Sequence, residues 1–253
     1  MLKRVRRGFL VLFSALFIFS SCSKEETLEL AGKTVAVEIA TSSVEAAKTI
    51  QDDVKEIQEF SSLDGAVSAV ESGEVDFVVM DEFSSASYIE GKRKIKEVKI
   101  LPYTTEYCAY FNKSSELVNE FNRVILELTE EGIIEEIRSS YKTGETYYPK
   151  LTKLTGDVPI LTIAIPITGY PFSDLKKDGT VIGIDVDIAT LIANRLGYNI
   201  ELVIVSADEA FNLLGTCEVD FIISGFTYDS ERAEYFNCSV TYFTENYVLL
   251  SKK

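Results

Sequence analysis

The sequence has no histidine, no tryptophan and only four cysteines among its 253 residues. Without histidine it cannot form a Ser-His-Asp or Cys-His catalytic group, and it lacks the usual proton shuttle at neutral pH. Most zinc sites are excluded for the same reason, and the cysteines show no metal-binding spacing. We therefore expect neither a metal nor another cofactor.

Positive charge is also scarce. There are 25 Lys and Arg against 40 Asp and Glu, which gives a formal net charge of −15 at pH 7. A protein this acidic repels nucleic acid and acidic lipid headgroups. We therefore expect its partners to be small solutes or other proteins, and we expect no nucleic acid.

The basic residues near the N-terminus belong to an export pattern. The stretch "MLKRVRRGFLVLFSALFIFSSC" has a basic start, an apolar run and then small residues before Cys22. The apolar run is short for a membrane span, which needs about 20 residues. Its end resembles a bacterial lipobox, although Phe19 stands where leucine is usual. We expect residues 1–21 to be a signal peptide and 22–27 a tether lipidated at Cys22. The exported protein would then face the periplasm or cell exterior on a lipid anchor; the alternative is ordinary secretion.

An internal repeat divides the rest of the chain. The stretch "SLDGAVSAVESGEVDFVVMD" at 62–81 is similar to "SADEAFNLLGTCEVDFIISG" at 206–225, with a constant offset of 144 residues. Upstream of each lies a β-branched run, "TVAVEIAT" from Thr34 and "LTIAIPIT" from Leu161. Repeats of this kind indicate duplicated supersecondary units. The chain therefore contains two similar α/β units.

Apolar runs and helical periods predict the elements of each unit. Strands that are apolar on both faces suit a sheet covered by helices on both sides, so the fold class is α/β. The expected strands are 34–39, 76–80, 161–165 and 220–224. The expected helices are 43–51, 63–72, 187–196 and 208–214, with "LTEEGIIEEIRSSYK" at 128–142 as a further helix. Open α/β sheets bind ligands at the carboxyl ends of their strands.

Those strand ends carry polar and charged residues. Thr41 and Ser42 precede a helix, where hydroxyls and free N–H groups either hold an anion or serve as a plain N-cap. Arg232 follows a buried strand and offers a planar fork that matches a carboxylate, or it is simply solvated. Asp81 either holds an ammonium group or caps the next turn. Together these groups could grip both ends of a free amino acid.

The segments that carry these residues resemble family 3 solute-binding proteins, the amino-acid-binding proteins of ABC transporters. "TIAIPITGYPFSDLKKDGTVIGIDVDIA" and "SGFTYDSERAEYF" resemble the first half of such a protein, and "SGEVDFVVMDEFSSASYI" resembles the second half. The halves stand in reverse order, which predicts a circular permutant. The resemblance implies a two-lobed, type II periplasmic-binding-protein-like fold with a hinge of crossing strands.

The permuted order also sets the expected boundaries. Lobe 2 would comprise 28–103 and 246–253, and lobe 1 would comprise 107–142 and 158–243. Residues 143–157 would be the permutation linker, joining ends that are close in space. Two alternatives stay open: a fragment of a tandem array, and an exchange of halves between two chains.

The resemblance also implies roles for the strand-end residues. The groups expected around the ligand carboxylate are Arg232, Thr41 and Ser42. Those expected around the ligand ammonium are Asp81, the Gly225 carbonyl and the Thr227 hydroxyl. Asp185 and Asp187, in "GIDVD", match a structural signature of the family and are expected to support the fold. Ala40 stands where the family often has glycine.

Two departures concern the wall of the side-chain pocket. Gly169 and Ala207 stand where the family commonly places aromatic residues. The aromatic residues that are candidates to compensate for them are Tyr170, Phe226, Tyr228 and Phe83. The sequence leaves the recognised ligand side chain open.

These features favour a lipid-anchored binding protein that captures an amino acid by hinge closure, delivers it to an ABC permease and catalyses nothing. The first alternative is a sensory or interaction protein on the same fold with altered ligand binding. An enzyme would need a general acid or base, for which Asp81 and Glu82 are the obvious candidates. Among the remaining cysteines, Cys108, Cys217 and Cys238, at least one thiol is free or intermolecular.

Overall fold

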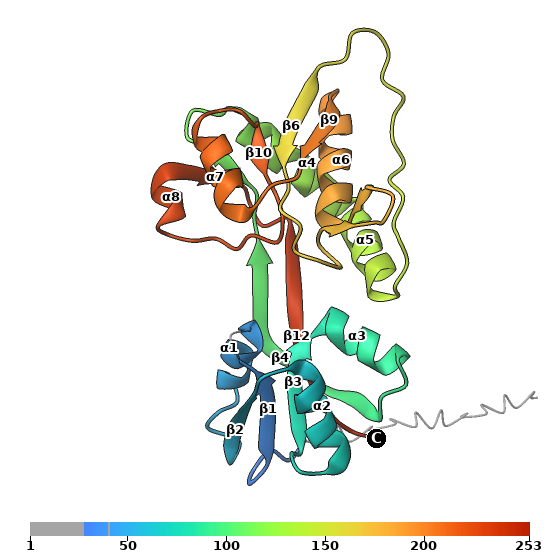
Figure 1. The fold of residues 1–253 in the computed structure, drawn as a ribbon, viewed down its shortest axis with the longest axis vertical. Helices are drawn as coiled ribbons and strands as arrows, with labels where there is room; N and C mark the ends of the chain where they lie inside the picture. Colours follow the sequence, from blue (N-terminus) through green and yellow to red (C-terminus); the bar gives the residue numbers. More distant parts are fainter. Residues whose placement is uncertain (1–27, 40) are drawn as a thin grey trace, which may run out of the picture.

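The computed structural model describes residues 28–39 and 41–253, so the expected signal peptide, the tether, Cys22 and Ala40 lie outside the described residues. The described chain forms two lobes connected by two long strands (Figure 1). None of the described helices is long and apolar enough to cross a membrane.

Lobe 2 is built first along the chain around a five-stranded sheet. Its strands are ordered β2-β1-β3-β12-β4, with β1 to β3 parallel and β12 antiparallel to both neighbours. The elements contributed by the first part of the chain are β1 (Thr34–Glu38), α1 (Ser42–Lys48), β2 (Glu56–Phe60), α2 (Leu63–Ser72), β3 (Phe77–Asp81) and α3 (Glu82–Glu90).

Lobe 1 repeats this architecture. Its strands are ordered β9-β6-β10-β5-β11, with β6 parallel to β9 and β10, and β5 antiparallel to its neighbours. Its elements are β5 (Tyr110–Asn112), α4 (Leu117–Glu130), α5 (Ile133–Lys142), β6 (Ile160–Ala164), the β7–β8 hairpin (Asp174–Leu175, Val181–Ile182), α6 (Ile184–Leu196), β9 (Asn199–Val203), α7 (Ala207–Gly215), β10 (Phe221–Ile222), α8 (Arg232–Tyr235) and β11 (Phe236–Cys238). The repeat found in the sequence therefore places α2 and α7, and β3 and β10, at equivalent positions.

Each sheet has a hydrophobic core on both faces, as the apolar strands predict. In lobe 2, Val35 and Val37 of β1 pack toward α1, whereas Ala36 packs toward α2. In lobe 1, Ile163 of β6 joins the core under α4, α5 and α6, and Ala164 joins the core under α7. The α/β fold class is confirmed.

The hinge consists of β4 (Ile95–Tyr107) and β12 (Phe243–Lys252), which pair antiparallel along most of their length. Phe243 pairs with Tyr107 near lobe 1, and Lys252 pairs with Ile95 at the far end in lobe 2. Both strands are visible in Figure 1 as the paired arrows that cross from one lobe to the other.

Some element boundaries differ from the predictions. The single helix expected over 128–142 is divided between α4 and α5, because Gly132 adopts a left-handed φ of 77° that ends regular helix geometry. The helix expected to start at Asp187 already begins at Ile184. No helix or strand lies between Lys142 and Ile160, and this segment runs along lobe 1 from α5 to β6 (Figure 1).

Candidate functional site

A cavity of about 380 Å³ lies between the lobes and contains Asp81. We name it the Asp81 cavity. Lobe 2, lobe 1 and the hinge all contribute to its lining, which consists of Asp81, Phe83, Ser84, Ser87, Tyr88, Tyr170, Pro171, Phe172 and Glu245. Its size falls in the range of small-molecule sites, about 300–1,000 Å³.

A second inter-lobe cavity, of about 440 Å³, contains Ser42 and is named the Ser42 cavity. It is lined by Ser42, Tyr103, Thr104, Thr105, Glu106, Thr227 and Tyr228. Glu245 of the Asp81 cavity pairs in register with Thr105 of the Ser42 cavity, so the two hollows adjoin across the hinge ladder. The expected strand ends of both lobes therefore meet at one inter-lobe region.

Asp81 occupies the carboxyl end of β3 and is also the N-cap of α3. Its Oδ1 accepts a hydrogen bond from the Ser84 backbone N–H at 2.7 Å, so the plain capping interpretation is correct. Its Oδ2 has no hydrogen-bond partner among the described residues. Asp81 therefore caps the helix and still presents a carboxylate oxygen that can meet a ligand.

Thr41 is the N-cap of α1, where its hydroxyl accepts from the Ser43 N–H at 3.3 Å and donates to the Glu38 carbonyl at 2.9 Å. Ser42, the next residue, lines the Ser42 cavity. From lobe 1, Thr227 lines the same cavity and its carbonyl accepts a hydrogen bond from Tyr110 at 2.8 Å. Ser42 and Thr227 thus face one hollow from opposite lobes.

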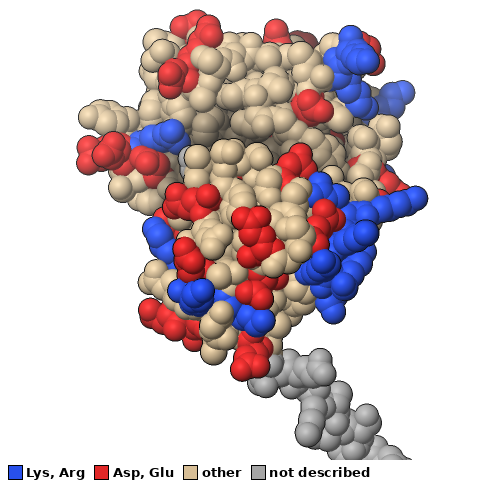
Figure 2. Space-filling model, turned by 60° about the horizontal axis from the view of Figure 1, so that its bottom comes forward, with Lys and Arg blue, Asp and Glu red and all other residues tan. Residues whose placement is uncertain are grey.

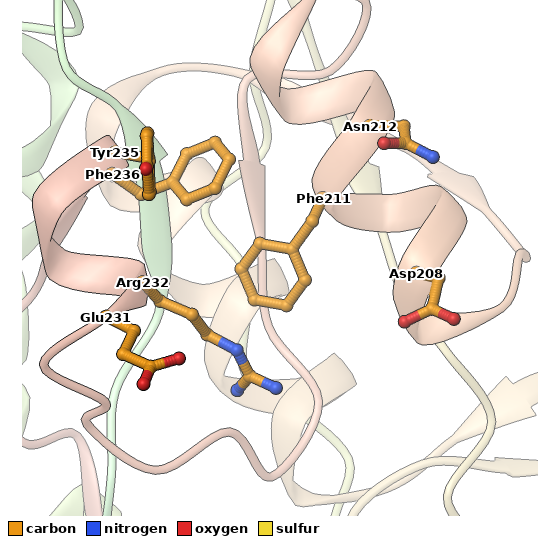
Figure 3. Close-up of a pocket in the computed structure, with 7 residues that line it drawn as sticks. All are labelled: Asp208, Phe211, Asn212, Glu231, Arg232, Tyr235 and Phe236. Atoms are coloured by element: carbon orange, nitrogen blue, oxygen red, sulfur yellow. The ribbon is translucent and has the colours of Figure 1, made fainter.

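Arg232 lies elsewhere. Its guanidinium carbon stacks 4.8 Å from the centroid of the Phe211 ring and 5.7 Å from that of Phe226. Figure 3 shows the side chain extending from α8 toward α7, in a separate cavity of about 470 Å³. The structure therefore does not bring Arg232 and Asp81 into one cavity, because cation–π contacts hold the guanidinium over lobe 1.

The aromatic residues expected to compensate for Gly169 and Ala207 divide into two groups. Tyr170, Phe83 and Tyr228 line the inter-lobe cavities. Phe226 lines neither of them, since its ring is buried against Tyr110 and Phe211 in the core of lobe 1.

The two aspartates of "GIDVD" connect α6 to different parts of lobe 1. Asp185 is fully buried and accepts a hydrogen bond from the Tyr242 hydroxyl at 2.6 Å, while the Gly225 N–H contacts that hydroxyl at 3.3 Å. Asp187 accepts from Tyr141 at 2.7 Å and ties α6 to α5. Burial raises the pKa of both carboxyls to about 7. Their expected role in the fold agrees with these contacts.

Residues 161–253 match the model of the bacterial extracellular solute-binding proteins, family 3. The matched segment comprises most of lobe 1 and the hinge strand β12.

A relative of this chain is the arginine-binding extracellular protein ArtP of Bacillus subtilis, which is 32% identical over 83 residues. That match covers 33% of this chain and 32% of the relative, so the chain matches about a third of the length of that protein. Among solved structures, the second substrate-binding domain of a protein assigned as an amino acid ABC transporter, from Streptococcus pneumoniae, is 12% identical with a TM-score of 0.50. The match covers 87% of this chain and 84% of that one, and it shows the shared fold.

Sequence reasoning missed one ionisable residue that lines the Asp81 cavity, Glu245. It is only 6% exposed, and its Oε2 accepts a hydrogen bond from the Tyr107 hydroxyl at 2.6 Å. Burial, and next to it the charge of Asp81, raises the pKa of Glu245 to about 7. The available signal was the alternation of "FTENYV", which places Phe243, Glu245 and Tyr247 on one face of a strand.

The residues that line the two inter-lobe cavities include three carboxylates, on Asp81, Glu245 and Glu106, and no lysine or arginine. Glu82, the other expected acid, lies outside both cavities, where it pairs with Arg138 and Lys142. Within the described ranges, no group of three or more His, Cys, Asp or Glu side chains is arranged to hold a metal ion.

Proposed function

We propose that this protein captures an amino acid or a similar zwitterion between its lobes and releases it to an ABC permease. The observation that carries the proposal is the inter-lobe region itself, because its lining comes from both lobes and from the hinge strand β12. The arginine-binding relative supports an amino acid as the ligand. Each lobe alone would satisfy part of the ligand, which gives a reason for the lobes to close around it.

Asp81 and the polar groups of the Ser42 cavity would meet opposite ends of the ligand. The free Oδ2 of Asp81 is suited to the ammonium group, with Gly225 and Thr227 approaching from lobe 1. Ser42 and Thr41 lie at the first turn of α1 and are suited to the carboxylate. Arg232 would join them once its guanidinium leaves the Phe211 ring, and its exposure leaves it free to do so.

Isothermal titration calorimetry against a panel of amino acids tests the proposal. We expect Arg232→Ala to weaken binding by about 2–5 kcal/mol, since a charged anchor of a desolvated ligand is lost. Arg123→Ala, which removes an arginine of the exposed face of α4, is the matched control and should leave affinity unchanged. Unchanged affinity in Arg232→Ala would exclude Arg232 from the site.

One observation favours the alternative, a sensory or interaction protein on the same fold with altered ligand binding. Arg232 and Asp81 line different cavities, and Gly169 and Ala207 leave the pocket without two aromatic walls. A folded protein that binds no amino acid of a wide panel would favour this alternative.

We further propose that the protein acts without catalysis. Asp81 and Glu245 are the acids that face the Asp81 cavity, and Glu82 is engaged in ion pairs. Incubation with a cyclohexadienyl acid tests this point, and turnover would contradict it.

The order of the lobes supports a circular permutation, which we propose together with the lobe boundaries given above. The chain completes the first part of lobe 2, crosses through β4, and returns to lobe 2 only at β12. The segment 143–157 would join the original ends. A gene rearranged to begin at residue 158, with the present ends linked, should yield a folded protein of unchanged ligand affinity.

Export and lipid anchoring through Cys22 complete the proposal. The family is described as extracellular, which supports export. Mass spectrometry of the protein from its own membranes tests the anchor: a diacylglycerol-modified Cys22 at the N-terminus is expected, and an unmodified N-terminus would contradict it.

A further inference from the structure

Glu245 sits where a hinge strand passes beneath the inter-lobe cavities. It belongs to β12 and is paired in register with Thr105 of β4. Its side chain lines the Asp81 cavity although the residue is only 6% exposed. A carboxylate so deeply buried at the floor of a ligand cleft is costly unless it is paired.

Only one of the two carboxylate oxygens of Glu245 has a hydrogen-bond partner among the described residues. Oε2 accepts the hydrogen bond from Tyr107, whose ring is held 4.7 Å from the centroid of Phe172. Oε1 has no hydrogen-bond partner among the described residues, and it is not among the fully buried atoms that lack one. The free oxygen therefore opens to the cavity, where a ligand group can reach it.

Among the described residues, no lysine or arginine forms an ion pair with Glu245. The charged and titratable groups that face it are Asp81 of β3, Glu82 of α3, Arg138 of α5, Tyr107 of β4 and Tyr247 of β12. Arg138 is engaged by Glu82, by Glu135 and by the Thr244 carbonyl. Burial, and next to it the charge of Asp81, raises the pKa of Glu245, and the charge of Arg138 offsets this only in part.

The ammonium group of a neutral amino acid needs one carboxylate, and Asp81 supplies it. Glu245 then remains as a second, unneutralised carboxylate in the same cavity. A ligand with a second positive charge would neutralise both. Two hydroxyls, of Ser84 and Ser87, and the aromatic rings of Tyr88 and Tyr170 line the same cavity and can contact the remainder of such a ligand.

We propose that Glu245 is a specificity-determining residue, which makes the cleft select amino acids with a cationic side chain over neutral ones. This inference rests on the proposed function, because it assigns the substrate class of the same cleft. The second charge of the ligand meets the free Oε1 of Glu245 while Asp81 holds the α-ammonium.

Calorimetry with L-arginine and L-citrulline tests this inference directly. The two ligands have nearly the same shape, and only arginine carries a side-chain charge. We expect the wild-type protein to bind arginine about tenfold or more tightly than citrulline at pH 8. In Glu245→Gln this preference should fall to about threefold or less, while the affinity for citrulline stays within about threefold of wild type.

Glu97→Gln is the matched control, because Glu97 is an exposed carboxylate of the other hinge strand, β4, and lines neither inter-lobe cavity. It should retain most of the preference for arginine, since an exposed charge is screened by water. A preference lost equally in both variants would overturn the assignment to Glu245.

The wild-type protein gives an independent readout that needs no variant to fold. Because Glu245 accepts a proton near pH 7, the ratio of arginine to citrulline affinity should fall as the pH is lowered from about 8 to about 5.5. Equal affinity for arginine and citrulline at pH 8 would overturn the inference and leave the proposed function standing. Absence of binding by every amino acid would overturn both.

Discussion

At the residue scale, buried carboxyl groups titrate near neutral pH in a protein that has no histidine. Asp185, Asp187 and Glu245 all have their pKa raised to about 7, chiefly by burial. No imidazole titrates in the same range. Other described acids have a lowered pKa. In Asp76, hydrogen bonds from Thr34 and Lys33 stabilise the charged carboxylate, so it takes up a proton only at a pH below the usual range of carboxyls.

The protein should therefore be less stable at about pH 8 than at about pH 5. A carboxyl whose pKa is raised in the folded state binds its proton more tightly when folded, so stability falls as pH rises between the unfolded and folded pKa values. We expect each of these carboxyls to contribute a loss on the order of 1–3 kcal/mol across this range, measured by urea denaturation.

Asp187→Asn should make stability depend less on pH, because the amide does not titrate. Its side-chain oxygen can still accept the hydrogen bond from Tyr141, so we expect the variant to fold. Asp178→Asn is the control, since Asp178 is exposed and its pKa is lowered by hydrogen bonds from Thr180. Stability that rises steadily from pH 5 to pH 8 would contradict the account of the buried carboxyls.

At the element scale, α3 and α5 connect the two lobes beside the hinge. Arg138 of α5 pairs with Glu82 of α3 and also donates to the Thr244 carbonyl of β12. Asn246 of the same strand donates to Glu82 at 3.2 Å. The side chains of Arg138 and Glu82 are 11% and 7% exposed, so this inter-lobe ion pair is nearly buried.

Glu82→Gln should destabilise the protein by about 3–5 kcal/mol, because it leaves Arg138 buried without its main counter-charge. Chemical denaturation measures this loss. Glu120→Gln, in an exposed ion pair of α4, should cost less than about 1 kcal/mol. Equal, small losses in both variants would show that the α3–α5 ion pair contributes little to stability.

The sequence predicts elements best where local pattern and tertiary packing agree. The bounds of α2 are the predicted ones, because Ser62 caps its start and Gly73 adopts a left-handed φ at its end. The position of Arg232 was not predictable, since its contact with Phe211 depends on how α7 and α8 pack. Glu245 was missed because a charged residue in a strand of alternating pattern is usually exposed to solvent.

At the scale of the whole molecule, the hinge joins the two similar lobes, together with the ion pairs of Glu82 with Arg138 and Lys142 and the packing of Phe83 of α3 into the core of lobe 1. On the face shown in Figure 2, acidic and basic side chains are interspersed, and the basic ones gather toward one edge. The net acidic charge is therefore not concentrated over that face, and the carboxylates of the inter-lobe cavities act on a ligand at short range.

Small-angle X-ray scattering with and without L-arginine tests the central claim, that the lobes close around a bound ligand. The radius of gyration should decrease when arginine is added, because Asp81 and Ser42 of lobe 2 approach Thr227 and Tyr170 of lobe 1. Citrulline, bound more weakly, should give the same decrease at higher concentration. An unchanged radius of gyration with calorimetrically saturated protein would contradict capture by hinge closure.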